Sequence, residues 1–124
     1  MLIRDFLNIL LDDTLEEARL RQHRGPTGGL AFAGAERAVA DCREAMTGER
    51  MGAKLKALLA EARATSAATA GRPDEAFWFS RELNVEWIAS VVSVVLLTVR
   101  AEAIIPPSRA AALKAAQLME LHRD

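Results

Sequence analysis

The sequence contains a single cysteine, Cys42, among its 124 residues. One cysteine cannot form a disulfide within the chain, and its lone occurrence is typical of proteins from reducing compartments. We therefore expect a cytoplasmic protein whose fold needs no disulfide. Cys42 falls on the apolar stripe of a predicted helix, which favours a buried thiol over a nucleophile because a reactive cysteine needs a nearby base or cation.

The chain also lacks an excess of charge of either sign. Its 16 basic and 17 acidic residues are interspersed and give a formal net charge of −1. No global field exists to attract DNA, RNA or anionic lipid, so a nucleic-acid role would need a local basic patch. Most basic residues are arginines, which pair well with carboxylates. The composition therefore predicts ion pairs within the chain or between subunits.

No long hydrophobic run or leader is evident. The apolar segment 88–99 is flanked by Glu86 and Arg100 and is shorter than the roughly 20 residues that a membrane-spanning helix needs. The apolar start, 1–11, is interrupted by Asp5 and is not followed by a small-residue cleavage site, so it is a poor secretory signal. We expect neither a membrane span nor a signal peptide.

No complete nucleotide-binding motif is present either. The stretch RGPTGGLAFAG, from Arg24 to Gly34, is rich in glycine but lacks the Lys-Ser/Thr ending of a P-loop and a preceding strand. The pattern predicts an ordinary interhelical loop over about 24–30. The alternative is an anion contact at Arg24, Gly28 and Gly29, because glycines before a helix leave backbone N–H groups free to face an anion.

Metal and catalytic motifs are missing as well. Asp12, Asp13, Glu16 and Glu17 form an acidic patch on a predicted helix, but no Glu-x-x-His pair accompanies it. The two histidines, His23 and His122, have no neighbouring ligand set. We predict a solvated acidic face, no cofactor, no metal and no catalytic residue, so the sequence indicates no enzyme.

Helical periodicity and the positions of Gly and Pro predict an all-α protein, with residues 1–124 forming a single domain of about five helices. The predicted helices cover about 2–23, 31–46, 49–68, 74–104 and the segment after Pro106 and Pro107. Residues 74–104 form the predicted spine, because Asp74 is a good N-cap and neither Gly nor Pro follows until Pro106. Whether this spine is one helix or bends near Asn84 is left open.

The spine also carries the residues that we predict to bind a partner. Phe77, Trp78 and Phe79 are consecutive, so on a helix they span about 200° and cannot all face one core. Tryptophan and arginine concentrate binding energy at interfaces. The interface candidates are Trp78 with Arg81, and Trp87 with Val91 and Val94.

The predicted function is a non-enzymatic α-helical interaction protein, such as an adaptor, regulatory or assembly subunit, that self-associates as a homodimer. One alternative is a nucleic-acid-binding accessory protein, since 62–83 faintly resembles a helix-turn-helix. The acidic start of its second helix, with Asp74 and Glu75, would repel phosphates. A second alternative is a small-molecule-binding protein or enzyme with a pocket near Trp78.

Overall fold

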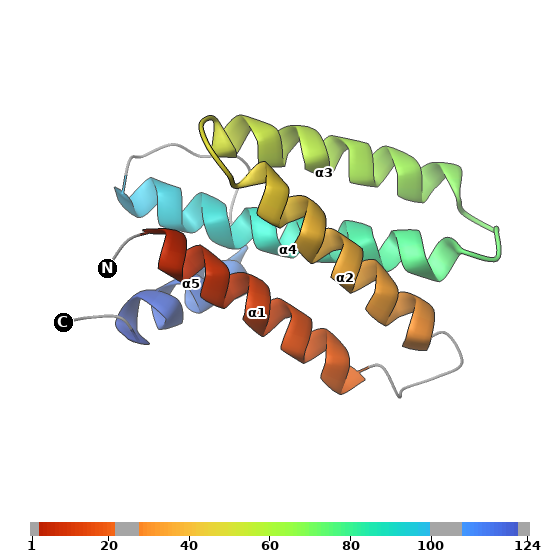
Figure 1. The fold of residues 1–124 in the computed structure, drawn as a ribbon, viewed down its shortest axis with the longest axis horizontal. Coiled ribbons are helices and arrows are strands. Elements are labelled where there is room, and N and C mark those ends of the chain that lie inside the picture. Colours follow the sequence, from red (N-terminus) through yellow and green to blue (C-terminus); the bar gives the residue numbers. More distant parts are fainter. Residues whose placement is uncertain (1–2, 22–27, 100–107, 122–124) are drawn as a thin grey trace.

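The computed structural model describes residues 3–21, 28–99 and 108–121, which form five α-helices and contain no β-strand (Figure 1). The helices are α1 (Ile3–Arg21), α2 (Gly28–Ala45), α3 (Met51–Ala68), α4 (Glu75–Val99) and α5 (Arg109–Leu121). The predicted all-α fold of five helices is confirmed. The boundaries follow the breakers, since Gly48 and Gly71 adopt left-handed φ angles of 72° and 80° in the turns after α2 and α3.

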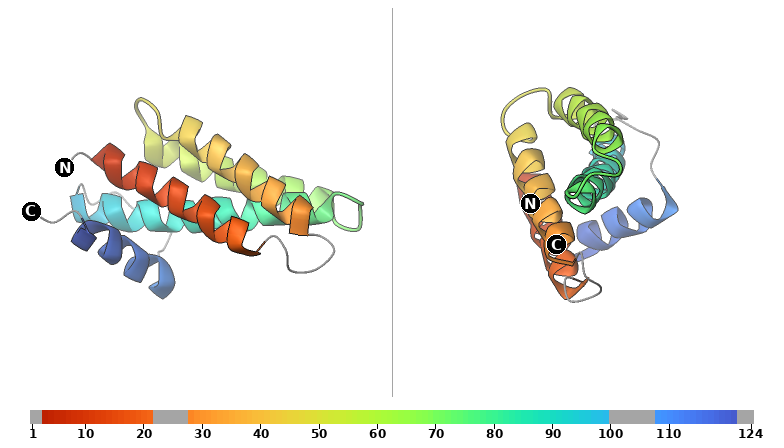
Figure 2. Two further views of the ribbon diagram at one scale, coloured as in Figure 1. Left: turned by 60° about the horizontal axis from the view of Figure 1, so that its bottom comes forward. Right: turned by 90° about the vertical axis from the view of Figure 1, so that its right-hand side faces the viewer.

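Helix α4 occupies the centre of the bundle and contacts the other four helices (Figures 1 and 2). It runs without interruption for 25 residues. Val85, Ile88 and Val92 on its core side are fully buried. The long apolar spine is therefore one helix as far as Val99, and its predicted end near residue 104 lies outside the described residues.

Helices α2 and α4 approach each other closely at Gly34. A Cβ atom added to Gly34 would lie 2.2 Å from the backbone oxygen of Phe77. One turn away, Ser80 Oγ donates a hydrogen bond of 2.6 Å to the backbone oxygen of Ala31. Ala35 and Ala38, two further small residues of α2, are also buried.

The start of α2 differs from the prediction. The helix begins at Gly28, not near residue 31, so 28–30 are helical and not part of the loop. Gly28 is buried. Glycine has a weak intrinsic preference for helix, but burial against neighbouring helices overrides that preference here.

Helix α5 packs against the C-terminal half of α4 (Figure 2). It is also joined to α1, since Lys114 forms an ion pair with Asp13. On α4, Ser90 and Ser93 are buried, whereas Phe79 and Leu83 nearer the N-terminus are 51% and 49% exposed. The outer side of α4 is therefore covered at Ser90 and Ser93 and open at Phe79 and Leu83.

Candidate functional site

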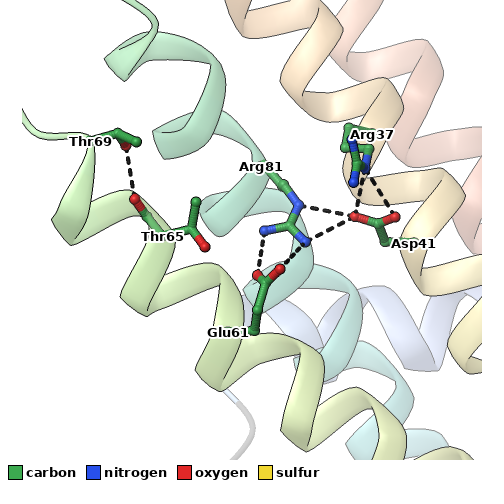
Figure 3. A network of polar contacts seen from close by, with 6 residues as sticks. All are labelled: Arg37, Asp41, Glu61, Thr65, Thr69 and Arg81. Atoms are coloured by element: carbon green, nitrogen blue, oxygen red, sulfur yellow. Dashed lines mark hydrogen bonds and ion pairs between the residues drawn. The ribbon is translucent and has the colours of Figure 1, made fainter. Parts of the chain in front are cut away.

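Arg81 is the buried centre of an ion-pair cluster that joins three helices (Figure 3). Its side chain is only 2% exposed. Its Nη1 and Nη2 donate to the two carboxylate oxygens of Glu61 on α3 at 2.7 and 3.1 Å. Its Nε donates to Asp41 Oδ2 on α2 at 3.0 Å. Asp41 also accepts hydrogen bonds from Arg37, so we call these four residues the Arg81 cluster.

The cluster is electrostatically satisfied. Burial alone disfavours the charged guanidinium, but the hydrogen bonds to Glu61 and Asp41 outweigh this effect and raise the pKa of Arg81 above its ordinary value. The N–H groups with which Arg81 could bind a phosphate already donate hydrogen bonds to the carboxylates of Glu61 and Asp41. The structure therefore places Arg81, a predicted interface residue, inside the chain as a link between α2, α3 and α4.

Trp78 lies beside this cluster and is partly buried. Its ring centroid is 5.5 Å from Arg81 Cζ, which is within the range of a cation–π contact. Its Nε1 donates a hydrogen bond of 2.9 Å to Asp74 Oδ2. Trp78 and Arg81, which were predicted as interface residues, thus contact each other within one chain.

The second predicted interface group divides between interior and surface. Val91 is fully buried, whereas Trp87 and Val94 are partly buried and pack against the hydrophobic core. The exposed large apolar residues of α4 are instead Phe79, Leu83 and Leu97. Phe79 and Leu83 are four residues apart, so they lie on one helix face. We call Ala76, Phe79, Leu83 and Trp87 the α4 apolar strip.

The α4 apolar strip forms one wall of a groove between α1, α2 and α4. The groove has a volume of about 510 Å³. Its opposite wall includes Glu17 and Arg21 of α1, and Phe32 of α2 contributes a further aromatic ring. The groove lies next to Trp87 and does not include Trp78, so this pocket is not the one predicted near Trp78.

The predicted anion contact is only partly within the described structure. Gly28 is buried and lines the α1–α4 groove. Gly29 is exposed, and a Cβ atom added to it would meet nothing within 4 Å. Arg24 lies outside the described residues. The two glycines therefore belong to the first turn of α2, and Gly28 alone reaches the groove.

The acidic patch of α1 is neutralised by paired cations. Glu16 pairs with Arg19, Glu17 with Arg21, Asp12 with Arg43 and Asp13 with Lys114. No group of three or more His, Cys, Asp or Glu side chains within residues 3–21, 28–99 and 108–121 could hold a metal ion. Both histidines fall outside these ranges. The helices of the described part also include none long and apolar enough to cross a membrane.

Cys42 is buried on α2, as the sequence predicted, with no exposed surface. Burial, with a further contribution from the negative charge of Asp41, raises the pKa of its thiol to about 12. The neighbouring Arg81 lowers this pKa, but by less. The thiol therefore stays protonated at neutral pH, and thiolate chemistry is not available to the folded chain.

The buried thiol leads to a testable expectation for its reactivity. At pH 8 in native buffer, we expect Cys42 to react with an aromatic disulfide reagent on the order of 1,000-fold more slowly than in 6 M guanidinium chloride, because reaction requires the helices to open. The rate is followed by absorbance of the released thiolate. A native rate within tenfold of the unfolded rate would show that Cys42 is accessible.

Comparisons of the chain with protein-family models, curated proteins and solved structures found no match.

Proposed function

We propose that the protein is a non-enzymatic α-helical interaction protein, an adaptor, regulatory or assembly subunit of the cytoplasm, that self-associates through the α4 apolar strip. The observation that carries this proposal is the exposure of Phe79 and Leu83 on neighbouring turns of α4. Large apolar side chains grouped beside a groove are typical of protein interaction sites. The lone cysteine supports the cytoplasmic assignment.

The charges around the strip favour a second copy of the chain as the partner. Glu75 and Glu82 lie three or four residues from Phe79, and neither makes an ion pair among the described residues. Arg21, on the α1 edge of the groove, pairs only loosely with Glu17 at 3.9 Å. A twofold axis at the groove could bring Arg21 of each copy close to Glu75 or Glu82 of the other.

The structure gives less support to the nucleic-acid alternative. Arg81 lies on the second helix of the segment that faintly resembles a helix-turn-helix, and its donors are engaged by Glu61 and Asp41. The same helix begins with Glu75 and carries Glu82, both of which would repel a phosphate backbone. Binding of a labelled duplex at low salt would contradict this reasoning.

Replacement of Phe79 tests the proposed self-association. We expect Phe79→Glu to weaken the dimer at least about tenfold, because an anchor side chain is lost and a charge is placed beside Glu75 and Glu82. Molar mass is measured by light scattering over a concentration series from 1 μM to 1 mM. Circular dichroism verifies that the variant is folded.

Leu113→Glu is the matched control, since Leu113 is 59% exposed and lies on α5, away from the strip. We expect this variant to associate like the wild type. A wild-type protein that is monomeric at every concentration would refute self-association. Equal weakening by both variants would show that the strip is not the interface.

A further inference from the structure

A second cavity lies at the other end of α1, away from the α4 apolar strip. It is formed by the N-terminal half of α1, the C-terminal end of α2 and the start of α3, and has a volume of about 520 Å³. Small-molecule sites in proteins commonly have volumes of roughly 300 to 1,000 Å³. The cavity is therefore large enough for a small organic ligand.

The floor of this cavity is apolar. Leu7 and Leu11 line it and are only 5% and 1% exposed, because they also belong to the hydrophobic core. Met46 and Met51 line it from the two sides of the α2–α3 turn and are partly buried. Methionine side chains adapt to varied apolar shapes. An apolar chain or ring could therefore replace water on this floor.

The charged groups of the cavity are all of one sign. Arg4 and Arg43 line it, and its lining residues include no Asp or Glu. Arg4 makes no hydrogen bond or ion pair within the described part of the chain. Arg43 is held in place from the side, since its Nη1 donates to Asn8 Oδ1 at 3.2 Å and its Nη2 lies 3.7 Å from Asp12 Oδ1.

Lys54 supplies a third positive charge at the edge of the cavity. Lys54 Nζ donates a hydrogen bond of 2.9 Å to the backbone oxygen of Thr47. Thr47 and Gly48 line the cavity from the α2–α3 turn. By contrast, the α1–α4 groove carries one arginine balanced by one glutamate. The lining of this cavity thus contains positively charged side chains and no carboxylate, whereas the lining of the groove contains both.

We propose that this cavity binds a small amphiphilic anion, in which a carboxylate or a phosphate monoester is attached to an apolar chain or ring. The guanidinium of Arg4, which has no partner among the described residues, and that of Arg43 would bind the anionic oxygens, since the arginine fork matches both groups in geometry. The apolar part would lie over Leu11, Met46 and Met51. This proposal is independent of self-association through the α4 apolar strip.

Four ligands with the same eight-carbon chain test the proposal by calorimetric titration of the wild-type protein: octanoate, octyl phosphate, octanol and octylammonium. We expect saturable binding of octanoate and octyl phosphate, each at least about tenfold tighter than octanol, and no saturable binding of octylammonium. Inorganic phosphate and acetate test the apolar part, and we expect both to bind at least about tenfold more weakly than their octyl counterparts.

Arg4→Met is the informative variant, because it keeps an apolar stem, removes the charge and breaks no ion pair or hydrogen bond within residues 3–21, 28–99 and 108–121. We expect it to weaken binding of octanoate about tenfold, while Arg4→Lys retains part of the affinity. Lys56→Met removes one exposed positive charge from α3, outside the cavity lining, and should bind like the wild type. Met46→Trp fills the cavity and should abolish binding of both anions.

The same chemistry could belong to a free metabolite or to the headgroup of an anionic lipid. Sedimentation with phosphatidylcholine vesicles containing 20% phosphatidic acid separates the two sources. Saturable binding of octyl phosphate without vesicle binding supports a free ligand, and binding to the vesicles that Arg4→Met removes supports a lipid headgroup. Failure of every anion to bind, or equal binding of octanol and octanoate, overturns the proposal. Light scattering on the same samples reports self-association separately.

Discussion

Gly34→Ala is expected to lower the free energy of unfolding by about 2 to 3 kcal/mol, because the new Cβ atom would overlap the backbone of α4. The Cβ would lie 2.2 Å from the oxygen of Phe77 and 3.0 Å from Ser80 Cβ. Neither neighbour is the end of a flexible side chain, so the two helices must separate. Urea unfolding followed by circular dichroism measures the change.

Gly29→Ala provides the matched control within the same helix. A Cβ atom at Gly29 would meet nothing within 4 Å. Alanine favours helix over glycine by up to about 1 kcal/mol, so this variant should be as stable as the wild type or more stable. If Gly34→Ala were also neutral or stabilising, the close approach of α2 and α4 at Phe77 would be wrong.

The helix boundaries that the sequence predicted well are those set by local chemistry. Glycine at 48 and 71 supplies the left-handed turns after α2 and α3, and α4 begins at Glu75, directly after the predicted N-cap Asp74. The start of α2 could not be predicted in this way. Gly28 and Gly29 are poor helix formers, and the burial of Gly28 against other parts of the chain is not recorded in any local pattern.

A local sequence pattern could not predict which residues pair with Arg81. Asp41 and Glu61 are 40 and 20 residues away in the sequence. The excess of arginine over lysine predicted ion pairs either within the chain or between subunits. The pairs of Arg81 are within the chain. Phe79 and Leu83 were not among the predicted interface residues, since their exposure depends on α5 packing against the second half of α4 (Figure 2).

Arg81→Met is expected to lower the free energy of unfolding by about 3 kcal/mol, the lower end of the range for breaking a buried ion pair. Methionine fills most of the space, so the loss arises chiefly from the unpaired carboxylates of Asp41 and Glu61. Glu61 is 56% exposed and regains water readily, whereas Asp41 is only 20% exposed. Asp41 should therefore account for most of the destabilisation, which chemical unfolding at pH 7 would measure.

The single variants of the acidic partners separate these contributions. Glu61→Gln should cost about 1 kcal/mol, because its solvent exposure screens the pair with Arg81. Asp41→Asn should cost more, since it also loses the pair with Arg37. The triple variant Arg81→Met/Asp41→Asn/Glu61→Gln should recover part of the stability lost in Arg81→Met, because the one charge left without its partner is that of Arg37, which is 53% exposed and hydrated. A triple variant less stable than Arg81→Met would show that lost packing, and not unpaired charge, explains the effect.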